Sequence, residues 1–557
     1  MCGSMASSNG DRDGTFFGHP IGLSTLFFTE MWERFSYYGM RAFLVLYMVA
    51  KVDEGGREMS DASAGVVMAL YTSSVYLLSL PGGWIADRFL GQRRAVTYGG
   101  LGIMLGNALL ALPIDGLFYP GLGVIAIGTG LLKPNISTIV GQLYTADDPR
   151  RDAGYTIYYM GINIGALAAP LACGFLAQSE MFRGFLADQG IDPKLCWHFA
   201  FGAATIGMGA GLIQYIIGWR RLGEAGLKPT VPSDPVKAAR DRTVLGVIVG
   251  SLGAIVALFV ILDVAGIAVS KDMIGNVFGV GLLIGTVALF VGLLRGARDH
   301  EERGRIIAIL PLFLGAIAFF AAFEQASTTL SLYTERFVNR EWIGVSVPAS
   351  YWQSANSVFV ILLAPVAAIV WVRLARAGRE PMDVKKFAIG MIFTAVSFLV
   401  LVPSIGAITE LTSAFRLVET VPYLEGVVDA GIEPMRVSAN YLVFYYLGAT
   451  IAELCISPVG LSSMSKLAPQ RMAGMVMGTW FLATAIGNYL AGRAAGFSEK
   501  RGYGFLFYTL IIGALVISAA LFLVAPKIKR MLGAPGGKGG KVPFDRSEKV
   551  EPEPLPK

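Results

Sequence analysis

Residues 29–44 read TEMWERFSYYGMRAFL and lie inside an apolar stretch that runs from about 22 to 50. The polar side chains of this stretch fall at offsets 0, 3, 4, 7, 8 and 11, and they belong to Glu30, Glu33, Arg34, Tyr37, Tyr38 and Arg41. With a period of 3.6 residues, these offsets place all six on one stripe of a helix whose other faces are apolar. Such a helix belongs in a membrane, with its stripe turned toward a partner or an aqueous cavity.

The composition of the whole chain leads to the same class. Of its 557 residues, 54% are hydrophobic and 15% are charged, whereas an average soluble domain is about 25% charged. A soluble fold of this size would expose too much apolar surface, and disordered, collagen-like and disulfide-rich secreted classes are excluded. The net charge of +6 does not indicate a nucleic-acid partner, because excess Lys and Arg in a membrane protein usually reports topology.

Apolar runs of roughly 20 residues predict an all-α polytopic membrane protein. We expect fourteen transmembrane helices arranged 6 + 2 + 6. The first six lie near 22–50, 61–86, 95–113, 117–143, 153–177 and 196–218, the inserted pair near 243–268 and 274–294, and the last six near 306–332, 349–375, 386–404, 438–464, 472–496 and 503–526.

These runs divide the chain into five parts. We expect an N-terminal segment 1–21, a six-helix bundle 22–221, a linker with the inserted pair 222–300, a second bundle 301–530, and a tail 531–557. The tail is rich in Gly, Pro and charge, so we expect it to be disordered. Most loop Lys and Arg residues lie in connections on the side of the N-terminus, which predicts that both termini are cytoplasmic.

Three further ionisable residues lie inside predicted helices. Lys133 precedes a proline in GTGLLKPNIS, whereas Glu324 and Glu453 are lone carboxylates in apolar surroundings. A buried, unpaired carboxylate holds a proton at neutral pH, while a nearby cation favours its ionised form. A group of this kind can alternate between a proton and a cation, as coupling a proton to a substrate requires. The alternatives are a snorkelling Lys133 near a helix end and, for the first helix, an ion-paired packing seam.

The distribution of charge between the halves indicates a kind of substrate. Cations gather in the first half and carboxylates in the second, which suits a zwitterion with separated charges and not a sugar. The repeated placement of a charge before a proline, at Lys133 and Glu453, is typical of a two-fold repeat with its site between the halves. Weaker polar candidates, for which helix packing is an equally good explanation, are Tyr76, Asn163, Asn356 and Trp480.

Cysteine and histidine are scarce. The four cysteines show no metal-ligand spacing and the three histidines lie near helix ends or in connections, so we expect no metal site and no organic cofactor. We therefore expect carboxylates, and not histidines, to bind and release any coupled proton.

The sequence resembles the proton-coupled oligopeptide transporters of the major facilitator superfamily, bacterial type. The residues Glu30-x-x-Glu33-Arg34-Phe35 match the family's ExxERF signature. The segment GGWIADRFLGQRR at 82–94 is similar to the loop motif of the superfamily. Further matches are KPNIS from Lys133, YYMGINIG at 158–165, FEQ around Glu324, and ELCISPVGLSSMSKLAP at 453–469. They extend over nearly the whole chain from residue 22 to about 530.

The resemblance implies a major facilitator fold and uptake of di- and tripeptides driven by a proton gradient, with alternating access to a central cavity. It implies that the peptide carboxylate is received by Arg34, Lys133, Tyr37, Tyr38 and Asn163, and the amino terminus by Glu453 with Asn356. Tyr76 and Trp480 would complete the wall. Glu30, Glu33 and Glu324 would carry protonation, with Arg41–Glu324 and Lys133–Glu453 as gating ion pairs. The proton would be the coupling ion.

The resemblance also implies a monomer in the lipid bilayer of the inner membrane, whose inserted helix pair contributes nothing to the cavity. This sequence departs from the family at Ser357, where a proline is frequent, and at Ala166, where a serine is usual. These departures affect local helix geometry and one polar contact.

Three other functions fit the sequence less well. A family member that carries nitrate or another non-peptide solute is the nearest alternative, although the opposed charges argue against a simple anion. A membrane-embedded enzyme is disfavoured because the predicted helices hold no mid-membrane histidine base, no aspartate pair and no Ser/His couple. A passive channel is disfavoured by the repeat.

Overall fold

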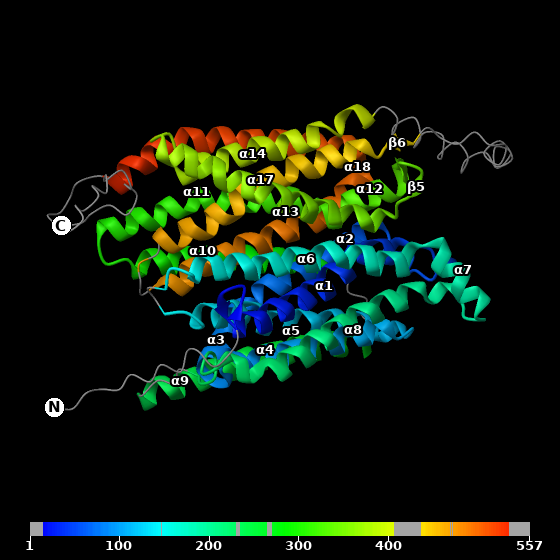
Figure 1. The fold of residues 1–557 in the computed structure, drawn as a ribbon, viewed down its shortest axis with the longest axis horizontal. Helices are drawn as coiled ribbons and strands as arrows, with labels where there is room; N and C mark the ends of the chain where they lie inside the picture. Colours follow the sequence, from blue (N-terminus) through cyan, green and yellow to red (C-terminus); the bar gives the residue numbers. More distant parts are fainter. Residues whose placement is uncertain are drawn as a thin grey trace.

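The computed structural model describes residues 15–145, 148–229, 234–264, 270–405, 436–467, 469 and 472–533. Long helices run side by side along the molecule (Figure 1). The only strands among the described residues form three short pairs: β1 (Thr15–Phe16) with β2 (His19–Pro20), β3 (Val338–Asn339) with β6 (Val437–Ser438), and β4 (Glu341–Trp342) with β5 (Val345–Ser346). The predicted all-α class is confirmed, while the predicted disorder of the tail falls almost wholly outside the described residues.

The N-terminal bundle contains one short helix, α7, that the sequence did not predict. Its helices are α1 (Gly22–Val49), α2 (Asp61–Leu77), α3 (Ser79–Ile85), α4 (Gln92–Ala111), α5 (Phe118–Gln142), α6 (Arg151–Gln178), α7 (Glu180–Asp188) and α8 (Cys196–Ile217). The stretch expected as one helix at 61–86 is divided at Leu78 into α2 and α3.

The inserted helices and the C-terminal bundle follow. They are α9 (Pro235–Val264), α10 (Lys271–Gly296), α11 (His300–Phe323), α12 (Thr329–Phe337), α13 (Ser354–Arg376), α14 (Asp383–Leu399), α17 (Asn440–Leu467) and α18 (Ala473–Gly533). Single turns of tighter or wider helix connect several of them: Val52–Glu54, Ala86–Leu90, Asp115–Leu117, Pro193–Leu195, Gly218–Leu222, Glu324–Ser327, Ala349–Gln353 and Val402–Ser404.

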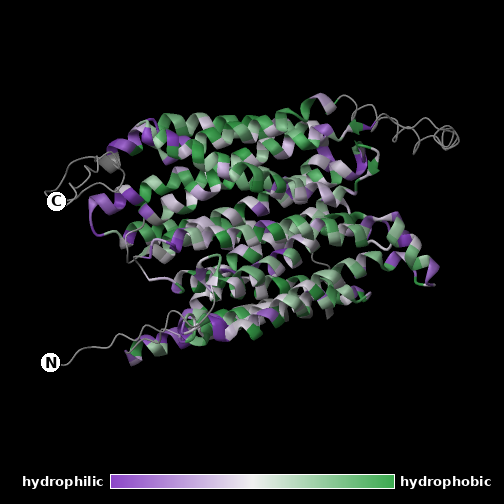
Figure 2. Cartoon of the chain, in the orientation of Figure 1, coloured by the Kyte–Doolittle hydropathy of each residue, from purple (hydrophilic) through white to green (hydrophobic). Residues whose placement is uncertain are grey.

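The hydropathy of the helices agrees with a membrane protein. Apolar residues occupy their middle parts and polar residues gather at both ends of the molecule (Figure 2). Ten helical segments in the described part are long and apolar enough to cross a membrane. One of them, Gly474–Arg530, holds two helices that meet at Gly502, whose φ of 82° interrupts the helix. The count of fourteen stays a prediction.

The ninth predicted helix, which is the first of the last six, is not continuous. We expected one helix at 306–332, but α11 ends at Phe323 and α12 begins at Thr329. Between them, one tight turn leads to Thr328, whose φ of −124° and ψ of −104° are not helical. Glu324, one of the candidate residues, lies in this break.

The buried apolar residues form separate cores in the two halves. One core joins α11, α14, α17 and α18 with parts of α10. Two others lie in the N-terminal bundle, and one of these also receives Leu332 and Ala349 from the C-terminal half. The halves therefore have cores of their own, and these two residues of the C-terminal half extend into a core of the N-terminal bundle.

Candidate functional site

A cavity of about 500 Å³ lies between the two bundles. Its lining includes eleven of the thirteen sequence-predicted residues, from both halves: Glu30, Arg34, Tyr38, Arg41, Tyr76, Lys133, Asn163, Glu324, Asn356, Glu453 and Trp480. Glu33 and Tyr37 are not part of it. The cavity is thus placed where the repeat in the sequence predicted it.

The stripe of α1 explains this division. Residues 30, 34, 38 and 41 follow one line along the helix and face the cavity, whereas Glu33 and Tyr37 follow the neighbouring line and are 0% and 2% exposed. Tyr37 packs between two guanidinium groups, with its ring centroid 5.3 Å from Arg34 Cζ and 5.7 Å from Arg41 Cζ. Tyr37, expected to contact the substrate carboxylate, therefore lies behind the wall and supports the two arginines by cation–π contact.

Arg34 is shared between two carboxylates. Its Nε lies 3.1 Å from Glu30 Oε1 and forms a second ion pair with Glu33. The hydroxyl of Tyr158, on α6, donates to Glu30 Oε2 at 2.7 Å. All four side chains are at most 6% exposed, so this cluster is an internal ion network in which each charge is paired or hydrogen-bonded.

Lys133 is positioned by a close crossing of α3 and α5. A Cβ at Gly82 would lie 2.1 Å from the carbonyl oxygen of Gly130, so only glycine allows the backbones to meet there. Asn135, next to the helix-internal Pro134, donates to the Leu131 and Gly82 carbonyls at 2.6 and 3.4 Å. Lys133 then lies in the cavity wall with its Nζ 3.9 Å from the centroid of the Tyr76 ring.

Two carboxylates of the C-terminal half line the cavity, Glu324 and Glu453. Glu453, on α17, accepts a hydrogen bond from Asn356 Nδ2 at 3.0 Å, and the same nitrogen donates to Thr450 Oγ1 at 3.1 Å. Trp480 packs edge-on against Phe320, with ring centroids 5.7 Å apart. Among the described residues no cation forms an ion pair with Glu453.

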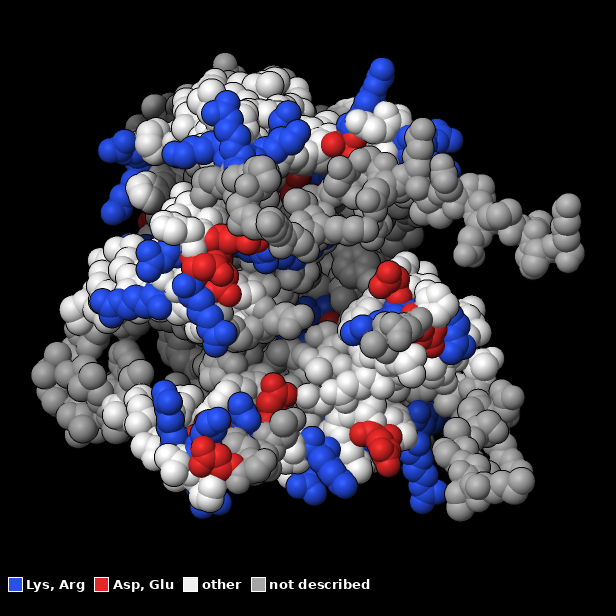
Figure 3. All heavy atoms as spheres, turned by 90° about the vertical axis from the view of Figure 1, so that its left-hand side faces the viewer, with Lys and Arg blue, Asp and Glu red and all other residues white. Residues whose placement is uncertain are grey.

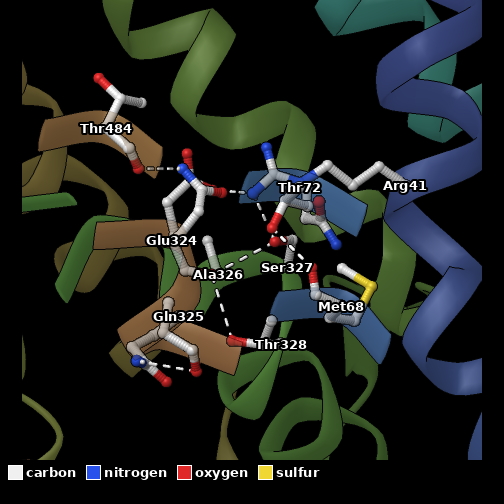
Figure 4. A network of polar contacts seen from close by, with 12 residues as sticks. Arg41, Met68, Thr72, Glu324, Gln325, Ala326, Ser327, Thr328 and Thr484 are labelled. Carbon is white, nitrogen blue, oxygen red and sulfur yellow. Dashed lines mark hydrogen bonds and ion pairs between the residues drawn. The ribbon is translucent and has the colours of Figure 1, made fainter. Parts of the chain in front are cut away.

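Arg41 crosses from α1 to the break between α11 and α12. It forms an ion pair with Glu324 and donates to Ser327 Oγ at 2.6 Å (Figure 4). The predicted pairing of Arg41 with Glu324 is therefore present. The other expected pair is not formed in this conformation, because Lys133 contacts Tyr76 and Glu453 contacts Asn356.

Further contacts between the halves gather beyond this pair, at what we call the closed end of the cavity. Arg336 of α12 makes a bidentate ion pair with Asp61 of α2 at 2.6 and 2.7 Å. The adjacent Glu335 accepts from Gln178 of α6 at 2.9 Å. Two successive residues of α12 thereby bind two different helices of the other half.

The opposite end of the molecule looks different. Figure 3 faces the end at which Figure 1 labels α3 and α9. There the surface is recessed between the two halves and bordered by many Lys and Arg side chains and by some Asp and Glu. We call this the open end. The structure thus has one end tied by ion pairs and one end recessed.

Sequence reasoning missed Tyr158, Ser327, Asp61 and the pair Glu335–Arg336. Tyr158 lay inside a quoted motif but at a helix position with no charge next to it. The letters Glu-Arg-Phe occur both at 33–35 and at 335–337, and this repeat was the signal that could have singled out the second pair. In the described part of the chain, no group of three or more His, Cys, Asp or Glu side chains is placed to hold a metal ion.

Comparison with known proteins gives three kinds of similarity. The family model of the POT family, PTR2, matches residues 93–504. The uncharacterized transporter YclF of Bacillus subtilis (strain 168) is 38% identical over 93% of this chain and 96% of its own length. A di-/tripeptide transporter of Lactococcus lactis subsp. cremoris is 36% identical over 93% of this chain and 97% of its own.

Solved structures agree with these matches. The crystal structure of a peptide transporter POT in complex with sulfate superposes with a TM-score of 0.79 at 36% identity, covering 93% of this chain and 97% of that one. Sequence and structure are therefore similar over almost the full length, the predicted major facilitator fold and family are confirmed, and the chain belongs to the POT family of multi-pass membrane transporters and is not an enzyme.

Proposed function

We propose that this protein is a proton-coupled symporter that imports di- and tripeptides by alternating access to the central cavity. The proposal rests on the opposite charges of the two cavity walls: Arg34 and Lys133 line one wall and Glu453 lines the other. A peptide carries a carboxylate and an ammonium group at its two ends, so it can satisfy both walls at once, which a simple anion or cation cannot. The name of the Lactococcus lactis relative, a di-/tripeptide transporter, supports this substrate class.

The carboxylate end of the peptide is assigned to the N-terminal wall. Arg34 is already paired with Glu30 and Glu33, so a peptide carboxylate competes with these two for the guanidinium. Protonation of either glutamate removes one competitor, because a neutral carboxyl attracts the cation far less. A proton and a peptide carboxylate therefore favour each other's binding, which is the thermodynamic requirement of symport.

The amino terminus of the peptide is assigned to Glu453. Its carboxylate is held by a neutral partner, Asn356, so an ammonium group can bind it without displacing a cation. Asn163, Tyr38, Tyr76 and Trp480 complete the wall. No cofactor other than the proton is needed for this cycle.

The ion pairs are assigned to gating. Arg41 and Glu324 hold the closed end, and protonation of Glu324 would release Arg41 and favour opening. Lys133 and Glu453 stand on opposite walls, and we propose that they pair when the cavity closes at its other end. The two ends then open in turn.

The charge of the open end supports an orientation in the membrane. Lys and Arg side chains border its recess (Figure 3), and positive residues favour the cytoplasmic side. We propose that the protein acts as a monomer in the inner membrane, with both termini in the cytoplasm.

Uptake into proteoliposomes with an imposed pH gradient tests the function. A labelled dipeptide should accumulate when the outside is acidic, and a protonophore should abolish this. Unlabelled di- and tripeptides should compete, whereas nitrate and free amino acids should not. If nitrate competed and peptides did not, the proposed substrate class would be wrong. If accumulation did not depend on the pH gradient, the proposed proton coupling would be wrong. Empty liposomes and the Glu453→Gln variant are the controls.

A further inference from the structure

The inserted helix α10 belongs to the core of the C-terminal bundle, although it lines no part of the cavity. Leu282 and Leu293 are 6% and 0% exposed and lie in the same core cluster as residues of α11, α14, α17 and α18. Phe290 packs edge-on against Phe313 of α11, with ring centroids 5.1 Å apart. Burial of this kind fixes α10 to the C-terminal half, because separating them would expose these side chains.

Polar contacts anchor the first turns of α10 to α18. Arg493 donates to Asp272 Oδ1 at 2.9 Å and to Asn276 Oδ1 at 3.3 Å. The hydroxyl of Tyr489, one turn earlier on α18, donates to the carbonyl oxygen of Gly275 at 3.0 Å. A Cβ at Gly279 would lie 2.4 Å from Tyr489 Oη, so the two helices meet more closely than any larger residue there would allow.

The same turns of α10 also touch the N-terminal half. A Cβ placed on Gly275 would lie 2.9 Å from Arg493 Nη1 and 3.2 Å from Cγ1 of Val66, which belongs to α2. Val66 is 2% exposed. This one glycine therefore lies against both halves of the protein.

Beneath α10, the halves are in backbone contact. A Cβ at Gly65 of α2 would lie 2.3 Å from the carbonyl oxygen of Gly492 of α18. Further along the same seam, Ser73 Oγ donates to the Ala485 carbonyl at 2.7 Å. The Gly65–Gly492 contact is four residues from Asp61, whose ion pair with Arg336 ties the closed end, so α10 covers the α2–α18 seam at that end.

We propose that α10 is a side brace: it moves with the C-terminal half and stabilises the conformation in which the cavity is closed at this end. Opening the closed end requires α2 to leave α18, and Val66 then loses its contacts with α10 as well as with the seam. The anchor of Arg493 on Asp272 keeps the brace in register with Val66. The inference rests on the alternating access proposed above and gives the inserted pair a part in it.

The brace is tested by the accessibility of a residue buried at the closed end. Ala349 is 1% exposed and packs into the core of the opposite half, so Ala349→Cys reacts with a membrane-impermeant maleimide only when that end opens. In intact cells that express the full chain, Arg493→Met should raise the labelling rate roughly fivefold, because a charged hydrogen-bonded anchor is lost. The milder Asp272→Asn, at an exposed position, should raise it about twofold.

Arg501→Met is the matched control, because Arg501 lies on the same helix and contacts only the nearby Phe505 ring among the contacts described for it. It should leave the labelling rate unchanged. Equal rates in the anchor variants and the control would overturn the brace, and if Arg493→Met fails to fold, Asp272→Asn decides alone. Labelling needs neither peptide nor gradient. Faster labelling of the anchor variants of a protein that transports no peptide would therefore support the brace and contradict the proposed function.

Discussion

The two walls of the cavity hold their charges in opposite ways. On the N-terminal wall, Arg34 is paired with Glu30 and Glu33, and Tyr158 donates to Glu30. On the C-terminal wall, Glu453 has only neutral hydrogen-bond partners among the described residues. On the first wall, the remaining members of the network can compensate for the loss of one. The second wall depends on Glu453, because its other carboxylate, Glu324, is paired with Arg41. The same substitution should therefore have very different effects on the two sides.

The largest effect on transport is expected at Glu453. Glu453→Gln should lower uptake of peptides with a free amino terminus roughly 100-fold, because a buried charge partner is removed. Amino-acetylated peptides should be affected far less, and competition assays in proteoliposomes measure both. Equal losses for the two kinds of peptide would show that Glu453 does not bind the amino terminus. Glu341→Gln, at an exposed position of β4, is the control.

The second largest effect is expected for the two glutamates that pair with Arg34, and it should appear in the coupling of proton binding to peptide binding. Glu33→Gln should reduce gradient-driven accumulation about tenfold or more, since a permanently neutral side chain cannot link proton binding to peptide binding. Exchange of labelled for unlabelled peptide should persist, because it needs no net proton movement. Glu30→Gln should behave alike. Undiminished accumulation under an acidic outside pH would contradict this role.

A smaller effect is expected for the cation that stands beside the network. Lys133→Met should weaken binding of peptides with a free carboxylate roughly tenfold, because Arg34 remains on the same wall and keeps part of the attraction. Peptides with an amidated carboxyl end should bind nearly as before. An identical loss for both peptides would place Lys133 outside the substrate contacts and leave it a gating residue.

The smallest effect is expected at the edge of the network. Tyr158→Phe removes one hydrogen bond to the Glu30 carboxylate and should slow uptake about fivefold or less, which corresponds to roughly 1 kcal/mol, because Arg34 still pairs with that carboxylate. Tyr155→Phe, on the same helix, is the matched control, since Tyr155 donates to the Ser137 carbonyl and not to the network. A loss as large as that of Glu33→Gln would mean that the network has no redundancy.

Much of the site followed from the sequence, because a charge inside an apolar helix is conspicuous in any membrane protein. Period 3.6 placed the six polar residues of α1 on one stripe. It could not separate Tyr38 from Tyr37, since adjacent residues are only about 100° apart and the packing of neighbouring helices sets the final rotation. Tyr158 was missed because an uncharged tyrosine in a helix gives no such signal.

The fold was predicted as a set of spans but not in its interruptions. Apolar length marks a helix that can cross a membrane, and it carries no information on a break inside it. The turn at Glu324–Ser327, which precedes the non-helical Thr328, is contacted by Arg41 from the other half, and apolar length cannot reveal such a contact. Glu335 and Arg336 likewise had no visible role until α12 was seen against α2 and α6.

The break between α11 and α12 has a mechanical consequence. A continuous helix is stiff, so tilting one end of it moves the other. Here the change of direction is confined to Thr328, and the residues that tie the closed end, Glu335 and Arg336, lie beyond it. Rotation about one residue can swing α12 outward while α11 keeps Phe320 against Trp480. Under the alternating access proposed above, α12 can therefore move at the closed end while the part of the cavity wall formed by α11 keeps its structure.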